Sequence, residues 1–387
     1  MAAFRVGHGR ACITPPLGIK MMGYAHRTEG AQDIHDDLFV NAVALEANGQ
    51  KVLLLAHDLC FFDLPLAAEI KSAIEDNTGL APECVLLNTS HTHAGPRVGA
   101  WHDQEGDEQY ERSIIAKSVA AAGTALAEAT ESAFLAGSAP VDIGCNRREM
   151  TPEGKVILGV NSDGQRLPEM TVWRFTRPDP PDIVVFSTAM HGTTLGGDNL
   201  SITAEWMGAA VRQLEAQIPD VRCVFLQGFG ADQNPYRENT SLELVEQHGR
   251  TAAAAVMQAL EGMRELNPTP LVCRMREVPL PLLDDESKTW PLPLHGIRIG
   301  DALLVGLGCE AFVEYAVHGR RVSPAEETLV LGYTDGSVGY LPTADAYKTG
   351  GYETVANRHF PVGSPFVPRS EQIVKDTVKE MLEELAA

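Results

Sequence analysis

Histidine residues follow several apolar runs of this sequence, at the points where polar loops begin. His91 and His93 form a His-x-His pair after the apolar run 84–87. Residues two apart on a strand point to the same face, so the sequence predicts that both imidazoles project together from the strand's carboxyl end. Two neighbouring imidazoles are typical of metal binding or proton transfer. The same sequence is also compatible with two loop histidines that form ordinary hydrogen bonds and have no chemical role.

A third histidine and a glutamate occupy similar places further along the chain. His191 follows the apolar run 183–186 and precedes Gly192, which makes it a candidate zinc ligand alongside the first pair. Glu310 follows the apolar run 303–307. Its carboxylate could complete a metal site, act as a general base, or lie in the first turn of the next helix, where the helix dipole favours an acid.

Two more loops carry polar groups. The loop 227–235 contains Asp232 and Asn234 after two glycines, which either let the backbone approach a ligand or form part of a strand-to-helix turn. Tyr340 and Tyr352 lie in glycine-rich stretches near the carboxyl end. Such tyrosines are also common as half-buried packing residues whose hydroxyl has a partner.

Apolar runs that alternate with amphipathic segments must position these loops. The pattern predicts strands at 39–46, 51–57, 84–88, 171–176, 183–189, 222–227, 302–307 and 328–333. It predicts helices at 64–76, 108–131, 203–217, 240–263, 311–319 and 369–385. We therefore expect an α/β fold with mixed β-sheet layers flanked by helices, in one domain over 1–387.

Composition excludes several classes of function. The 387 residues carry a formal net charge of -21, which argues against nucleic acid and anionic membrane surfaces as partners. We expect no membrane insertion, because no run approaches the roughly 20 apolar residues of a membrane span. The start lacks a signal-peptide pattern, and the seven scattered cysteines fit a reduced compartment, so we expect a cytoplasmic protein. Serine-hydrolase, Walker and His-Glu-x-x-His motifs are absent.

An ordered set of short motifs runs through nearly the whole chain. It comprises Gly7-x-Gly9-x-x-x-Ile13-Thr14-Pro15, Met22-Gly23-Tyr24-Ala25, His35-Asp36-Asp37-Leu38, Thr89-Ser90-His91-Thr92-His93-Ala94-Gly95-Pro96, Asn146-Arg147, His191-Gly192-Thr193, Gly230-Ala231-Asp232-Gln233-Asn234-Pro235, Glu310, Tyr340 and Tyr352. Together these motifs resemble the catalytic domain of the neutral (non-lysosomal) ceramidases, which are zinc-dependent amide hydrolases. The resemblance implies a neutral-ceramidase-like catalytic domain without the carboxy-terminal β-domain of that family.

The resemblance also implies a zinc ion (Zn2+) with four ligands: His91, His191, Glu310 and Tyr340. It implies that His93 faces the substrate beside the metal, while Arg147 and Tyr352 hold polar groups of the substrate or intermediate. Zinc lowers the pKa of a bound water toward about 7, which supplies hydroxide at neutral pH. His93 or Tyr352 is then the candidate proton donor to the leaving group.

Three points around this site stay open in the sequence. Asp58 could fix the tautomer of an imidazole or cap a structural element. A second metal could use His93 with Asp58 or Asp232. Asn234 stands where the family has a serine, and an amide side chain cannot act as that serine's nucleophile, so we expect no covalent acyl-serine route.

We therefore predict a zinc-dependent hydrolase that uses a metal-activated water to cleave an amide (N-acyl) bond in a soluble small-molecule substrate. One alternative is an ester, lactone or glycosidic-bond hydrolase on the same zinc site. Another is a non-catalytic metal-binding relative, although such a protein would need neither His93 nor Arg147 beside its ligands. A homo-oligomer is compatible with the sequence.

Overall fold

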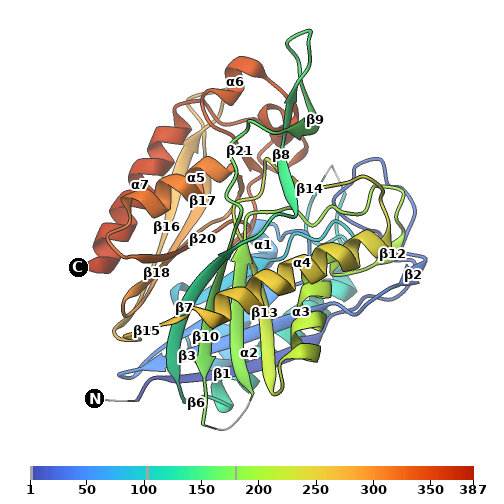
Figure 1. Cartoon of the computed structure of the whole chain (residues 1–387). Helices are drawn as coiled ribbons and strands as arrows, with labels where there is room; N and C mark the ends of the chain where they lie inside the picture. The colour runs from blue at the N-terminus through green and yellow to red at the C-terminus, as the bar shows by residue number, and fades with distance from the viewer. Residues whose placement is uncertain (1–2, 102–103, 179–180) are drawn as a thin grey trace.

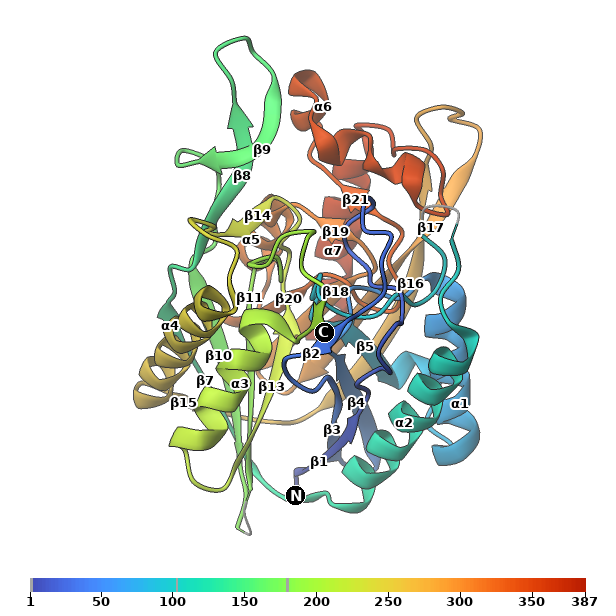
Figure 2. The same cartoon turned by 90° about the vertical axis from the view of Figure 1, so that its right-hand side faces the viewer.

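Three β-sheets meet around a common core in the computed structural model, which describes residues 3–101, 104–178 and 181–387. The first sheet has the strand order β5-β4-β3-β1-β6, with the bounds Val85–Thr89, Gln50–His57, Phe39–Ala47, Arg5–Cys12 and Thr130–Glu131. Helices α1 (Leu64–Thr78) and α2 (Glu108–Ala127) cover its outer face (Figure 2).

The second sheet faces the first across the core. Its order is β13-β11-β10-β7-β15, with the bounds Val221–Gln227, Asp182–Thr188, Glu169–Thr176, Ala133–Pro140 and Arg264–Leu266. Helices α3 (Glu205–Gln217) and α4 (Leu242–Glu261) pack on its outer face. In Figure 2 the helix pairs α3–α4 and α1–α2 therefore lie on opposite sides of the two sheets.

The third sheet closes one end of this arrangement. Its order is β16-β17-β18-β20, with the bounds Leu271–Pro281, Thr289–Ile299, Ala302–Leu307 and Glu327–Leu331, and it carries α5 (Val313–Val322) and α7 (Ser370–Ala386). All three sheets contribute to one buried cluster, for example through Leu54, Trp173 and Leu304. Burying each such side chain stabilises the fold by about 1.5–3 kcal/mol.

Shorter elements surround the ends of these sheets. They are β2 (Asp33–Ile34) with β12 (Ser201–Ile202), β19 (Glu310–Ala311) with β21 (Tyr340–Leu341), α6 (Ala346–Thr349), and the 3-10 turns η1 (Pro82–Cys84), η2 (Tyr352–Thr354) and η3 (Ala356–His359). A further three-stranded sheet joins β14 (Gln233–Pro235) to the hairpin β8 (Gly144–Met150) and β9 (Val156–Asn161). Both views show this hairpin extending beyond the body of the molecule (Figures 1 and 2).

The expected fold class and elements are confirmed. Each predicted strand coincides with an observed strand to within two residues at either end, and all six predicted helices form. The helix predicted for 108–131 ends earlier, at Ala127. Local chemistry explains where several helices begin; Asp63, for example, caps α1 by accepting a hydrogen bond from Leu66 N.

The sequence patterns missed β1, β7–β9, β16 and β17. Prolines interrupt the alternation in β16 and β17, and prolines argue against a strand assignment. Strand β1 contains Gly7 and Gly9, where a Cβ atom would lie about 2 Å from the carbonyl oxygens of Ala125 and Ala121 in α2. These two glycines therefore allow a helix to pack directly against a strand. The requirement for glycine cannot be predicted from the neighbouring residues, because the helix comes from a distant part of the sequence.

Candidate metal centre and active site

Parallel strand pairs bring the candidate loops together. Each large sheet contains one parallel pair joined through a helix: β4 with β5, β11 with β13, and β18 with β20. Loops at the carboxyl ends of these strands meet through backbone bridges between Thr92 and Gly192, between Asn88 and Thr334, and between Glu310 and Tyr340. The three sheets thus build one site at their common edge, as open α/β sheets usually do.

The backbone predicted for the histidine pair was wrong. Strand β5 ends at Thr89, and His91 has a φ of 59°, a left-handed conformation that is uncommon for a residue other than glycine. The two residues therefore do not share one face of a strand. Their rings converge all the same, because His93 Nε2 lies 3.0 Å from His91 Nε2.

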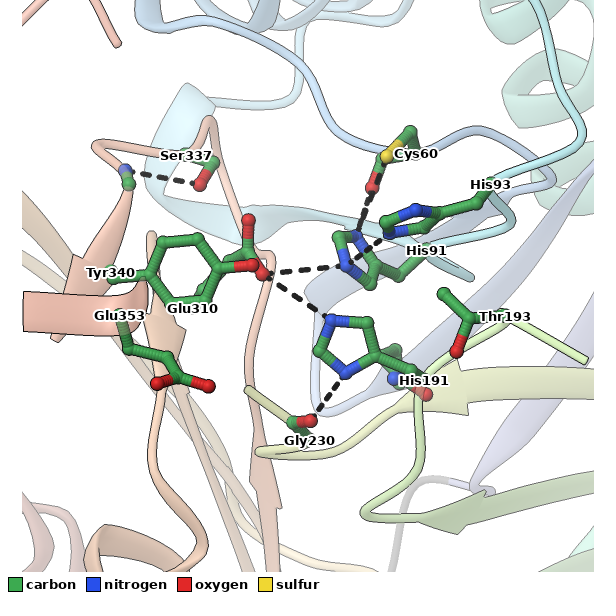
Figure 3. Close-up of polar contacts among 12 residues, drawn as sticks. Cys60, His91, His93, His191, Thr193, Gly230, Glu310, Ser337, Tyr340 and Glu353 are labelled. Carbon is green, nitrogen blue, oxygen red and sulfur yellow. Dashed lines mark hydrogen bonds and ion pairs between the residues drawn. The ribbon is translucent and has the colours of Figure 1, made fainter. Parts of the chain in front are cut away.

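Backbone carbonyls orient two of the imidazoles. His91 Nδ1 lies 2.9 Å from Cys60 O, and His191 Nδ1 lies 2.5 Å from Gly230 O and 3.0 Å from Gln233 O (Figure 3). A carbonyl oxygen only accepts, so each Nδ1 carries a proton, and each ring turns its Nε2 toward the site. Sequence reasoning missed these partners because a backbone carbonyl has no sequence signature.

Asp58 does not orient either ring. Its carboxylate accepts a hydrogen bond from Phe39 N at 2.9 Å and lines a separate cavity between the first two sheets. Burial raises the pKa of Asp58 to about 7. Of the two roles that the sequence left open for Asp58, the structure favours the structural one.

Glu310 brings a carboxylate close to the Nε2 atoms of both histidines. Its Oε2 lies 3.4 Å from His91 Nε2 and 3.6 Å from His191 Nε2, and all three side chains are almost completely buried. We call these three residues the His/Glu centre. Burial alone would raise the pKa of Glu310, but the neighbouring imidazoles outweigh it and hold that pKa below its usual range. Glu310 is therefore ionised at neutral pH.

The His/Glu centre fits a divalent cation. Glu310 Oε2 is buried and, among the described residues, has no hydrogen-bond donor. Burial and the charge of Arg147 lower the pKa of His191 to about 3, so its ring is neutral and cannot supply a proton. Three potential ligand atoms therefore converge: Glu310 Oε2 and the Nε2 atoms of His91 and His191, of which His191 Nε2 accepts a hydrogen bond from Arg147 Nη1. Their separations match the roughly 3.4 Å expected between ligands bound to one tetrahedral zinc ion at about 2.1 Å.

A second group of potential ligands fits a metal less well. The Cys60 sulfur and the nitrogens of His91 and His93 also lie near one another. Burial raises the pKa of Cys60 well above its usual range, which disfavours the thiolate that metals bind. The sequence left open a second metal bound by His93 together with Asp58 or Asp232. Among the described residues, no cluster of potential ligands joins these side chains. Asp232 instead accepts hydrogen bonds from Asn146 Nδ2 and Val313 N.

Tyr340 points its hydroxyl toward Glu310 and the histidines (Figure 3). Pairing of β19 with β21 places it beside Glu310, and Arg147 Nη2 lies 3.3 Å from its hydroxyl oxygen. Burial and the nearby carboxylate of Glu310 raise the pKa of Tyr340 well above its usual value. Without a cation the phenol therefore keeps its proton, so its role as a fourth ligand stays a prediction.

A buried ion-pair network supports the other side of the centre. Arg147 Nε lies 2.8 Å from Glu353 Oε1, and Arg148 Nη1 lies 2.5 Å from Glu353 Oε2. Arg147 Nη1 also lies 3.1 Å from His191 Nε2 and 3.4 Å from Asn234 Oδ1. Sequence reasoning found Arg147, Tyr352 and Asn234 but missed Glu353, although it directly follows Tyr352 in the sequence.

A cavity of about 450 Å³ opens in front of the His/Glu centre, and we call it the site cavity. Five of the site residues predicted from the sequence line this cavity: His93, Arg147, Asn234, Tyr340 and Tyr352. His93 is uncharged at neutral pH, because burial holds its pKa well below the usual value. The structure thus gathers every predicted site residue around one centre and one cavity; their roles stay predictions.

Comparison with solved structures gives the fold its name. A crystal structure of the neutral ceramidase from Pseudomonas aeruginosa matches the whole chain with a TM-score of 0.84. The chain has a neutral-ceramidase fold. Sequence identity with that structure is 17%, and the match covers 75% of its chain. A structure described as a ceramidase complexed with C2 matches with a TM-score of 0.83, at 16% identity over 100% of this chain and 76% of that one.

The neutral-ceramidase fold confirms the resemblance found in the sequence at the level of architecture. No protein-family profile matches the chain. Sequence divergence is therefore large, at 17% identity, while the fold is shared. The prediction that residues 1–387 form a single domain, without the carboxy-terminal β-domain, stays a prediction.

Proposed function

We propose that the protein is a zinc-dependent hydrolase that cleaves an amide (N-acyl) bond in a small-molecule substrate. The observation that carries this proposal is the convergence of two imidazole nitrogens and a carboxylate oxygen in the buried His/Glu centre, a set of atoms that could hold a cation. His91, His191 and Glu310 would hold the ion, with Tyr340 as a fourth ligand. Nitrogen and carboxylate ligands suit zinc, and the adjoining cavity leaves room for water and substrate. The neutral-ceramidase fold supports the choice of an amide bond.

The chemistry that zinc supplies when bound is the activation of a water molecule and the polarisation of a carbonyl group. The side chains of the cavity perform the remaining tasks. Arg147 keeps its charge, because Tyr340 and Glu353 raise its pKa against the opposing effect of burial. It can therefore stabilise the oxyanion that forms when water attacks the acyl carbon.

Two side chains can move or hold protons in the cavity. His93 is neutral, so it can accept a proton from the attacking water and pass it to the leaving nitrogen. Tyr352 remains a hydrogen-bond donor at neutral pH, because burial and the carboxylate of Glu310 raise its pKa to about 12. Asn234 cannot be acylated as a serine would be, so the proposed route has no covalent acyl-enzyme.

The cellular location is part of the proposal and not a finding. We propose the cytoplasm, on the basis of the scattered cysteines, all seven of which are free thiols in the structure. No helix in the described part of the chain is long and apolar enough to cross a membrane. Fractionation of the producing cells would test this location.

Metal analysis tests the proposed function directly. We would measure zinc by mass spectrometry in the wild type and in His191→Ala, with His248→Ala as the matched control. His248 is also a buried histidine, but it hydrogen-bonds to Tyr236 O away from the centre. We expect about one equivalent of zinc in the wild type and the control and almost none in His191→Ala. Parallel assays should show hydrolysis of N-acyl amides by the zinc-loaded wild type.

Two results would contradict the proposal. A wild type that binds no zinc after reconstitution would remove the metal site. Zinc binding without hydrolysis of any N-acyl or ester substrate in a broad panel would leave a metal-binding protein without this activity.

A further inference from the structure

The site cavity is basic in a strongly acidic protein. The chain has 52 aspartates and glutamates against 31 lysines and arginines. The described residues that line the site cavity nevertheless include two arginines, Arg147 and Arg237, and no carboxylate. With this composition, an average stretch of surface would carry more carboxylates than basic groups. The basic lining of the site cavity therefore differs from the rest of the protein.

The two arginines differ in how their charge is compensated. Arg147 is buried and forms an ion pair with Glu353. Arg237 is exposed, and no ion pair or hydrogen bond joins its guanidinium to another residue in the described part of the chain. Its charge therefore remains available to a ligand in the site cavity.

The backbone that carries Arg237 is held firmly. Arg237 lies two residues after the end of β14, and in the preceding residue Tyr236 N donates to Ile143 O at 3.0 Å while Tyr236 O accepts from His248 Nε2 at 2.9 Å. Across the cavity wall, Tyr24 stacks edge-on against His93 with ring centroids 5.2 Å apart. The positive charge of Arg237 opposes the rise in the pKa of Tyr24 that burial causes, which places Arg237 within electrostatic range of this pair.

Apolar side chains line the same cavity. Leu158 and Val160 of the projecting β8–β9 hairpin are 51% and 60% exposed, and both contribute to the wall. A ligand that fits this lining would combine an apolar acyl group with a negatively charged group. Guanidinium groups pair with carboxylates through two parallel hydrogen bonds, which makes a carboxylate the best-matched anion.

We propose that Arg237 is a specificity-determining residue that binds a carboxylate on the substrate, and that the substrates are N-acyl amino acids. This inference rests on the proposed function. In the reaction, water adds to the acyl carbon, the C–N bond breaks, and the leaving nitrogen takes a proton. The products are a carboxylic acid and a free amino acid, so atoms and charge balance without a further reactant.

A pair of matched substrates tests the inference. We would compare an N-acyl amino acid with the same compound whose carboxylate is replaced by a primary carboxamide, using zinc-loaded protein. We expect the wild type to favour the carboxylate by about 10-fold to 100-fold in kcat/KM, since a charge-assisted hydrogen bond contributes about 1.5–3 kcal/mol. Arg237→Gln should lose this preference through a higher KM, while kcat/KM for the carboxamide stays within about twofold.

A second arginine provides the matched control. Arg250 lies exposed on α4, outside the site cavity, so Arg250→Gln removes the same charge from the protein surface without touching the wall. It should keep the wild-type preference. Equal hydrolysis of both substrates by the wild type, or an unchanged preference in Arg237→Gln, would overturn the inference and leave the proposed function intact.

A binding measurement separates the two proposals. An N-alkyl amino acid, in which a methylene replaces the acyl carbonyl, cannot be hydrolysed. Calorimetry with this compound should show about 10-fold weaker binding to Arg237→Gln than to the wild type, with or without zinc. If neither matched substrate is hydrolysed but this difference is present, the proposed function fails and the carboxylate site stands. Equal binding to both proteins would overturn the carboxylate site.

Discussion

The His/Glu centre and the wall of the site cavity are built by different parts of the fold. His91, His191 and Glu310 follow strands of the three large sheets and are at most 2% exposed. The wall comes from the β8–β9 hairpin and from loops, and Tyr352 and Val160 are 41% and 60% exposed. Packing fixes the centre from all sides, whereas the wall can change without disturbing the core.

This difference has a consequence for substrate choice. The centre holds three residues that could bind a metal, while the wall carries Asn234 and the uncompensated Arg237. Under the proposed function, the strand ends would supply the chemistry and the surrounding loops would select the substrate.

The largest effect is expected in the centre. Glu310→Gln keeps the shape of the side chain but removes its negative charge, so zinc loses its only carboxylate ligand among the described residues of the cluster. We expect less than about 0.1 equivalent of bound zinc after dialysis and a loss of activity of roughly 10³-fold or more. Zinc analysis and initial rates measure both. Retention of zinc and activity would show that the centre does not hold the metal.

Arg147 lies between the two regions, so its removal should affect stability and catalysis together. Arg147→Gln leaves the buried carboxylate of Glu353 paired with Arg148 alone. We expect a free energy of unfolding lower by about 3 kcal/mol and a kcat lower by about 10²-fold.

A double variant separates these two effects. Arg147→Met with Glu353→Met removes the uncompensated charge and should regain much of the stability, as measured by denaturant unfolding, while kcat stays low. Recovery of kcat in the double variant would mean that Arg147 only maintains the structure.

The pKa of His191 offers a smaller test of how tightly the centre is packed. Its folded-state pKa of about 3 lies below the unfolded value of about 6.5, so between these values only the unfolded chain binds a proton. Acidification from pH 6 to pH 4 should therefore destabilise the metal-free wild type by about 1.4 kcal/mol per pH unit relative to His191→Gln. NMR titration of the His191 ring should show no protonation above pH 4.5; a midpoint near 6.5 would contradict the packed centre.

The smallest effect is expected in the wall. Asn234 Oδ1 accepts only long hydrogen bonds, 3.4 Å from Arg147 Nη1 and 3.3 Å from Thr193 Oγ1. Asn234→Ser should therefore change kcat/KM by less than about 10-fold. Mass spectrometry during turnover should detect no acyl adduct on the new serine. A trapped adduct would show that one substitution is enough to create a serine nucleophile in this cavity.

The sequence by itself determined most of the strands and helices and the identity of the candidate site residues. Periodicity over about ten residues predicts an element such as α4, and polar residues after apolar runs pointed to His91, His191 and Glu310. Tertiary structure alone decided how these residues meet. The carbonyls of Cys60 and Gly230 orient the imidazoles of His91 and His191. Glu353 forms an ion pair with Arg147, and Gly7 leaves room for helix α2 to pack on β1. Each of these contacts joins residues more than 30 positions apart in the sequence. Local patterns record burial and hydrogen-bonding preference, whereas contacts between distant segments depend on the packing of the three sheets.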